Sequence, residues 1–167
     1  MISAIVAVDV NWGIGYKGQL LERIPDDLKY FKQLTEDNIV IMGKNTWDSL
    51  PFKPLPNRVN IVLSRSITPC ATFYNSTNTS TYFTNQIPWE KFQTYKEVFV
   101  IGGGSIYEQL LPFCDRIYVT KIYKEHGNLV DTYFPNLDEN DAWSATPRSP
   151  IREYEGLTYQ FWQYDRI

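Results

Sequence analysis

Residues 97–111 read EVFVIGGGSIYEQLL, and the rest of the chain is organised around them. The run from 98 to 101 is apolar and rich in β-branched residues, which is typical of a buried parallel strand. Three glycines follow, and Ile106, Tyr107 and Leu110 then recur at helical spacing. Such a turn presents backbone N–H groups to an anion, because glycine has no Cβ to keep the ligand away. An ordinary tight turn would read the same way, since the pattern is not G-x-G-x-x-G.

Length and composition limit the possible classes of protein. The 167 residues predict one domain, 1–167, with a single core. A net charge of −3 argues against nucleic acid or an anionic membrane as partner. Without a signal peptide or a membrane-length apolar run, we expect a cytoplasmic protein. Cys70 and Cys114 lack metal-ligand spacing and are interpreted as free thiols, and the single histidine, His126, argues against a metal site.

Strand patterns alternate with helix patterns along most of the chain. Apolar, β-leaning runs at 2–8, 39–42, 59–63 and 116–123 are separated by helical patterns. These patterns begin near Pro25 and near Lys44, span 88–95, and follow the glycines. Further strands follow without helices, namely a short one at 131–135 and a hairpin at 143–146 and 157–164. The predicted fold is α/β: a single domain with a mainly parallel twisted sheet, an antiparallel C-terminal edge and flanking helices.

Two features at the ends of predicted strands indicate ligands. Residues 9–23 carry Gly13, Gly15 and Gly18 directly after the first strand, which favours a functional lid over a disordered bulge. Lys44 and Arg65 each follow a strand, so both cations lie at the same sheet edge as the glycine turn. One such cation would be an ordinary solvated charge, but two indicate a phosphate site.

Asp27 is a candidate functional acid. It lies in the first turn of the helix that begins at Pro25, one turn before Phe31 on the same side. A carboxylate therefore borders an apolar face. The alternative is a first-turn acid that only stabilises the helix dipole, and Asp26 fits that description equally well.

Taken together and in order, the motifs resemble dihydrofolate reductase. The matching segments span nearly the whole chain: MISAIVA at 1–7, IG at 14–15, IPDDL at 24–28, VIMGK at 40–44, TW at 46–47, LPNR at 55–58, LSR at 63–65, VIGGG at 100–104, Tyr107, and DTYFP at 131–135. The resemblance implies NADPH-dependent reduction of 7,8-dihydrofolate to 5,6,7,8-tetrahydrofolate, with hydride transfer to C6 and protonation of N5. It also implies sensitivity to antifolate-type inhibitors and a monomer.

The resemblance assigns residues to the substrate. Asp27 matches the catalytic carboxylate that hydrogen-bonds the pterin, helped through water by Thr120, and burial should raise its pKa. Arg58 matches the guanidinium that clamps the glutamate α-carboxylate of the substrate. The apolar walls around the pterin and benzoyl rings are implied to be Ile5, Ala7, Leu28, Phe31, Leu50 and Leu55.

A second group of residues matches the cofactor site of the family. Lys44, Ser64 and Arg65 match the group that grips the 2′-phosphate, which implies NADPH rather than NADH. The first two glycines, 102 and 103, match a pair joined by a cis peptide. The remaining residues implied to contact the cofactor are Ala7, Ile14, Gly43, Thr46, Leu63, Ile101, Gly103, Gly104 and Tyr107.

The chain departs from the family pattern at Glu22, where the family usually has tryptophan. We expect its side chain to point out of the pocket, restrained by Arg23, because an unpaired inward carboxylate would pay a desolvation cost. An inward carboxylate would instead raise the apparent pKa of its pair with Asp27. Two other functions stay open: a reductase of a related heterocycle, and a weakly catalytic or non-catalytic nucleotide-binding or structural descendant.

Overall fold

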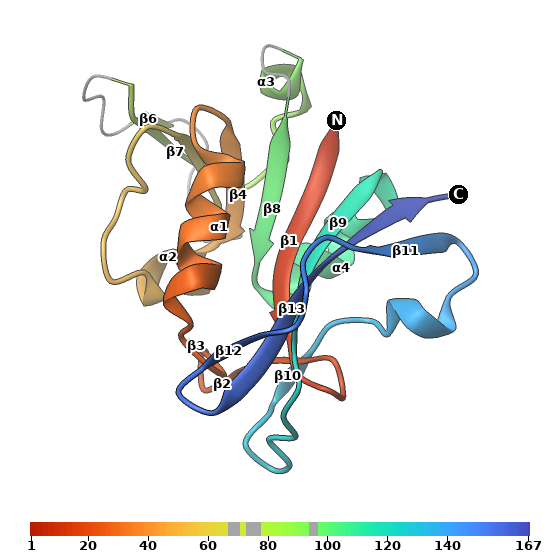
Figure 1. Ribbon diagram of the computed structural model, residues 1–167. Coiled ribbons are helices and arrows are strands. Elements are labelled where there is room, and N and C mark those ends of the chain that lie inside the picture. The colour runs from red at the N-terminus through yellow and green to blue at the C-terminus, as the bar shows by residue number, and fades with distance from the viewer. Residues whose placement is uncertain (67–70, 73–77, 94–96) are drawn as a thin grey trace.

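The computed structural model describes residues 1–66, 71–72, 78–93 and 97–167. Within them, one large sheet runs in the order β11-β13-β9-β1-β8-β4-β5-β7-β6, with β12 paired to β13 (Figure 1). Its strands are β1 (Ile2–Val8), β4 (Ile39–Gly43), β5 (Val59–Leu63), β6 (Ala71–Thr72), β7 (Ser80–Thr84), β8 (Val98–Gly102), β9 (Arg116–Ile122), β11 (Trp143–Pro147), β12 (Arg152–Tyr154) and β13 (Leu157–Arg166). The helices are α1 (Pro25–Thr35), α2 (Lys44–Ser49), α3 (Trp89–Phe92) and α4 (Gly104–Leu110), with short 3-10 turns at Leu111–Phe113 and Leu137–Glu139.

The interior of the sheet is parallel and its C-terminal edge is antiparallel. Strand β1 pairs in parallel with both β8 and β9, while β4 pairs in parallel with β5 and β8. Strand β13 then pairs antiparallel with β9 and β11. The fold class predicted from the sequence is therefore confirmed.

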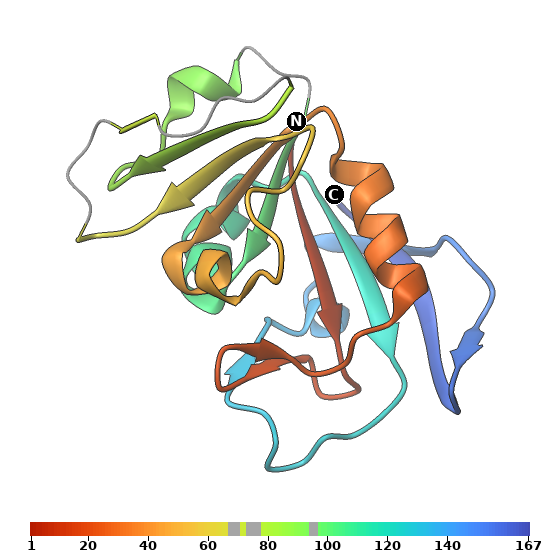
Figure 2. The same ribbon diagram turned by 90° about the vertical axis from the view of Figure 1, so that its left-hand side faces the viewer.

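Side chains alternate between the two faces of the sheet, as the pleat of a strand requires. In β4, Ile39 and Ile41 join a core cluster that includes Ile106 and Leu110 of α4. Val40 and Met42 face the other way and pack near Leu34 of α1. Helices α1 and α4 therefore cover opposite faces, and Figure 2 shows α1 on its side of the sheet; Trp47 of α2 packs on the same face as α1.

The segment 9–23, predicted to be a functional lid, forms a hairpin; its function stays a prediction, and the segment is called the lid below. Strands β2 (Gly13–Tyr16) and β3 (Gln19–Leu20) pair antiparallel, and β10 (Thr132–Tyr133) adds a third strand to this small sheet. Its first turn is fixed by Asp9, whose Oδ1 accepts hydrogen bonds from the backbone N–H groups of Asn11 and Gly13 at 2.9 and 2.8 Å. Trp12, buried at 5% exposure, packs against Phe134 behind this turn.

Other elements differ in detail from their predicted bounds. The helix expected at 88–95 is shorter, because α3 ends at Phe92 and residues 94–96 lie outside the described residues. The C-terminal hairpin carries the additional strand β12. Cys70 is likewise outside the described residues, whereas Cys114 is a buried free thiol. None of the described helices is long and apolar enough to cross a membrane.

Candidate active site

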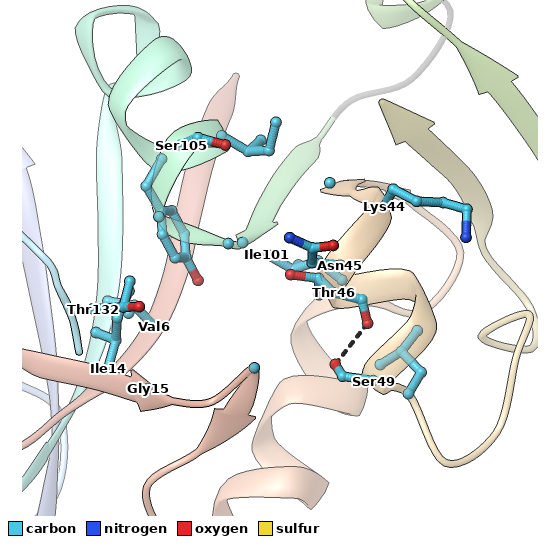
Figure 3. A pocket seen from close by; sticks show the side chains of 18 of the residues that line it. Val6, Ile14, Gly15, Lys44, Asn45, Thr46, Ser49, Ile101, Ser105 and Thr132 are labelled. Atoms are coloured by element: carbon cyan, nitrogen blue, oxygen red, sulfur yellow. Dashed lines mark hydrogen bonds between the residues drawn. The ribbon is translucent and has the colours of Figure 1, made fainter. Parts of the chain in front are cut away.

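A cavity of about 1580 Å³ opens where the central parallel strands end. Its floor is built from residues at or just after the carboxyl ends of β1, β4, β5 and β8. Figure 3 shows Val6 and Ile14 on one side of this space and Lys44, Asn45 and Thr46 on the other. Ligands of open α/β sheets bind at this position, because loops and helix starts converge there.

One end of the cavity is apolar and contains a single acid. Of the residues assigned to the substrate, all except Arg58 and Thr120 line the cavity: Ile5, Ala7, Asp27, Leu28, Phe31, Leu50 and Leu55. The last turns of α1 do not reach this space, so the helix contributes mainly its first half. Arg23 and Phe52 line the cavity as well, and sequence reasoning did not single them out for this role.

Asp27 accepts a direct hydrogen bond from a neighbouring strand. The hydroxyl of Thr120 on β9 donates to Asp27 Oδ1 at 2.5 Å, and the help that Thr120 is expected to give through water in binding the pterin stays a prediction. Thr120 is itself buried and does not line the cavity, so it reaches a ligand there only by way of Asp27. Burial raises the pKa of Asp27 above its ordinary value, while the Thr120 hydrogen bond acts to lower it and the charge of Asp26 to raise it. The predicted direction of this pKa shift is confirmed.

Asp26 and Asp27 have different surroundings although they are adjacent. The Asp26 carboxylate accepts hydrogen bonds from Arg152 at 2.8 Å and from the Tyr159 hydroxyl at 2.9 Å, on the side of α1 away from the cavity. Partial burial acts to raise its pKa, but these two partners outweigh burial and leave the pKa below the usual range. Of the two acids only Asp27 lines the cavity, which favours Asp27 as the functional acid.

Arg58 is buried behind the cavity wall and is only 4% exposed. Its Nε donates to the carbonyl of Pro56 at 2.9 Å and its Nη1 to the Thr35 hydroxyl at 3.1 Å. The guanidinium also lies 5.9 Å from the ring centre of Phe31, which does line the cavity. Desolvation lowers the pKa of Arg58, but an arginine keeps its proton in a protein, so the guanidinium is charged.

The opposite end of the cavity is polar and cationic. All the residues assigned to the cofactor line the cavity: Ala7, Ile14, Gly43, Lys44, Thr46, Leu63, Ser64, Arg65, Ile101, Gly103, Gly104 and Tyr107. Arg65 is exposed. Lys44 is already paired with Asp48, one helical turn away, at 2.6 Å. The two predicted cations therefore differ, because one of them has a carboxylate partner.

The glycine turn is tightly packed. Gly102 has φ +125°, a conformation that favours glycine, and the peptide bond from Gly102 to Gly103 is cis, as predicted. A Cβ on Gly104 would lie 2.8 Å from Cγ2 of Thr132, so a side chain there would displace the end of the lid sheet. The hydroxyl of Tyr107 donates to the carbonyl of Ile5 at 2.6 Å and joins α4 to β1 beneath the cavity.

Several polar side chains in the cavity were not identified from the sequence. Ser49 donates to the carbonyl of Thr46 at 2.7 Å, drawn as a dashed line in Figure 3. Ser105 directly follows the glycines, so its position after the turn could have identified it as a cavity residue. Asn85, Gln86, Trp89 and Gln109 also line the cavity, and no motif marks the first three of these residues.

Glu22 points away from the cavity, as expected, but its partners are not the predicted one. Its Oε1 lies 3.0 Å from Lys124 Nζ and 3.1 Å from His126 Nε2. Arg23, the predicted partner, instead lines the cavity. The side chains of Glu22 and Arg23 therefore lie on opposite sides of the lid.

The fold and the cavity together define the class: an α/β protein with a ligand cleft at the carboxyl ends of parallel strands. The family described as Dihydrofolate reductase matches residues 1–166, and the chain belongs to that family. It is 36% identical to the dihydrofolate reductase of Bacillus subtilis, over 99% of this chain and 95% of that protein. It is 38% identical to the dihydrofolate reductase of Buchnera aphidicola, over 96% and 93%, and 35% identical to that of Schistosoma mansoni, over 98% and 95%.

This family reduces dihydrofolate to tetrahydrofolate with a nicotinamide cofactor. The chain is accordingly an oxidoreductase of tetrahydrofolate metabolism, and the function predicted from its sequence is confirmed at this level.

Proposed function

We propose that this chain reduces 7,8-dihydrofolate with NADPH and that Asp27 is the catalytic residue that holds the pterin. The observation that carries the proposal is the environment of the carboxylate. Thr120 occupies Oδ1, and within the described residues no protein group hydrogen-bonds Oδ2, which is open to the cavity. A carboxylate so placed accepts N–H groups of a pterin, and its low-dielectric surroundings favour a protonated ring beside it.

The apolar residues around Asp27 exclude water from the bound pterin. Phe31 and Leu28 project from the same helix as Asp27, and Ile5 and Ala7 close the floor. Removing water strengthens the interaction of the carboxylate with the pterin, because the local dielectric constant falls. When bound, NADPH supplies the hydride that C6 receives.

We propose that Arg58 binds the α-carboxylate of the substrate's glutamate tail. Its Nε and Nη1 are fixed by Pro56 and Thr35, so the guanidinium is held in one orientation. Within the described residues its Nη2 makes no hydrogen bond and remains available. An arginine fixed in this way loses little side-chain entropy on binding a carboxylate.

The cavity's polar end fits the nicotinamide nucleotide, and we propose that Arg65 makes the main contact with the 2′-phosphate of NADPH. Arg65 is exposed and makes no ion pair within the described residues. Lys44 contributes less, because its ammonium must be shared with Asp48. The glycine turn lets the cofactor approach the main chain closely.

Mixing the purified protein with NADPH and dihydrofolate, and following the loss of cofactor absorbance, tests the proposal directly. The reaction should require both compounds, proceed much more slowly with NADH, and nearly stop in Asp27→Asn. Binding of NADPH without turnover would instead favour a non-catalytic descendant, for which the replacement of tryptophan by Glu22 is the motivating feature. The free thiol of Cys114 supports the expected cytoplasmic location, and the monomer remains a prediction for light scattering to measure.

A further inference from the structure

Four charged or titratable side chains meet on the side of the lid away from the cavity: Asp9, Glu22, Lys124 and His126. Asp9 and Glu22 flank the lid hairpin, whereas Lys124 and His126 belong to the loop between β9 and β10. Figure 2 shows this loop running beside the lid. We call the four residues the clasp. The roles proposed above for substrate and cofactor use none of them.

His126 lies at the centre of the clasp, and its side chain is 7% exposed. Its Nδ1 is 3.1 Å from Asp9 Oδ2 and its Nε2 is 3.1 Å from Glu22 Oε1. Asp9 is buried, and both of its carboxylate oxygens also accept hydrogen bonds from the backbone. Oδ1 accepts from the N–H groups of Asn11 and Gly13, and Oδ2 accepts from the N–H group of His126. The imidazole therefore bridges a fixed, buried carboxylate and a carboxylate on the lid.

The proton count of this bridge follows from hydrogen-bond chemistry. Ionised carboxylates only accept hydrogen bonds, so both ring contacts are hydrogen bonds only when the imidazole carries a proton on each nitrogen. A neutral ring has one N–H and must give up one of its two partners. With the ring protonated, two cations and two carboxylates balance, and no charge in the clasp is left unpaired.

Glu22 is the end of this bridge that belongs to the lid. It lies between Leu20 and Arg23, which line the cavity while Glu22 faces away from it. Partial burial acts to raise the pKa of Glu22, but hydrogen bonds from Lys124 and His126 outweigh burial and leave the pKa below its ordinary value. The Glu22 carboxylate is therefore ionised at neutral pH and can accept hydrogen bonds from both Lys124 and His126.

We propose that His126 is a positioning residue that fastens the end of the lid through Glu22 and thereby holds Leu20 and Arg23 in the wall of the substrate cavity. Glu22 thus restrains the lid from the side away from the cavity, at a position where the family usually has tryptophan. Only a protonated imidazole can donate to Asp9 and Glu22 together, so loss of the His126 proton loosens the clasp, although Lys124 remains 3.0 Å from Glu22. Asp9, Glu22 and Lys124 are the charged groups that face the ring, and Asp9 is buried and fixed. This inference rests on the proposed function, because its main readout is the binding of dihydrofolate.

Glu22→Gln and His126→Gln test the clasp with little change in side-chain size. Each should raise the KM for dihydrofolate by about 3- to 10-fold, the range expected for one net hydrogen bond. The affinity for NADPH, measured by fluorescence, should stay unchanged because neither residue lies near the polar end. The double variant should be no worse than the more affected single variant. Glu125→Gln is the matched control: it removes an exposed carboxylate from the same loop and should leave KM unchanged.

The pH dependence separates positioning from simple structural support. His126 is the only histidine, so its imidazole signals in NMR spectra report the protonation of the clasp without ambiguity. The KM of the wild-type protein should rise over the pH range in which that signal titrates, and His126→Gln should lack this rise. Asp27 contributes the same pH dependence to both proteins, so the difference between the two profiles isolates His126.

Three outcomes would overturn the inference. The pH profiles of KM could have the same shape in the wild-type protein and His126→Gln, or the increases in KM of the two single variants could multiply in the double variant. The third is a titration of the His126 imidazole signal that does not change in Glu22→Gln. The NMR signal is independent of turnover. If the wild-type protein failed to reduce dihydrofolate, the proposed function would fall while the clasp could still be tested. If His126→Gln failed to fold, Glu22→Gln would carry the same comparison.

Discussion

Asp27→Asn should remove activity and at the same time stabilise the protein. The change is nearly isosteric, and the asparagine Oδ1 can still accept the hydrogen bond of Thr120. It removes a charge whose presence in the cavity is unfavourable, since burial raises the pKa of Asp27. We expect kcat/KM at pH 7 to fall by about 10²- to 10⁴-fold, the range typical of a positioned acid–base group.

The sign of the stability change follows from proton linkage. Because the folded-state pKa of Asp27 lies above its unfolded value of about 3.9, the folded protein holds more protons between the two values. The free energy of unfolding therefore falls as pH rises through this window, and the loss is complete above the folded pKa. Each unit of difference corresponds to about 1.4 kcal/mol, or about 3–6 °C in Tm for a chain of this size. The Asp27→Asn variant avoids this loss at pH 7 and gains nothing below about pH 4.

Asp26→Asn is the matched control, since it changes the adjacent acid to the same amide. Arg152 and Tyr159 hold the pKa of Asp26 below its usual range, so its contribution to stability is present at neutral pH and disappears on acidification. This variant should lose a little stability at pH 7 and keep nearly full activity. Thermal melts and steady-state kinetics on both variants over pH 3–8 decide the matter. If Asp27→Asn were destabilised at pH 7, or Asp26→Asn were the inactive variant, the assignment of the two acids would be wrong.

Two further substitutions test the ends of the cavity. Arg65→Ala should weaken NADPH binding by about 10-fold or more while leaving NADH binding unaffected. Lys44→Ala should weaken NADPH binding less, because Asp48 already shares the charge of Lys44. Fluorescence titration of both cofactors measures these affinities, and equal losses of NADPH affinity in the two variants would contradict the prediction. Arg58→Lys should raise the KM for dihydrofolate while sparing a pterin that lacks the glutamate tail, because an ammonium cannot reproduce the fixed guanidinium; equal effects on both substrates would remove Arg58 from the tail site.

Local patterns predicted most of the fold. The strand at Ile2–Val8 and the helix beginning at Pro25 match their predicted positions, because an unbroken apolar run and a proline at the first helical position are strong local signals. The ordered motifs also identified about half of the residues that line the cavity. The end of α3 was misplaced, since four residues of helix leave little periodicity to detect.

Contacts between distant parts of the chain were not predictable. Glu22 meets His126 across 104 residues, and nothing near Glu22 in the sequence indicates that partner. The Thr120 hydroxyl reaches Asp27 directly because the spacing between β9 and α1 is set by packing, which a motif does not report. By contrast, Asp48 lies four residues after Lys44 on one helix, so that pairing was readable from the sequence and was overlooked.

Strand β13 has a consequence for the order in which the protein matures during synthesis. Phe161 on this strand pairs with Thr120 in β9 and stacks on Tyr30 of α1 at 4.3 Å, and Tyr159 holds Asp26. The residues that line the cavity end at Thr132, so a ribosome has made all of them before it begins β13. A nascent chain at that stage lacks the strand that supports Thr120 and α1. The folate end should therefore become competent only after translation has passed residue 161, whereas β4, β5 and β8 at the nucleotide end can pair earlier.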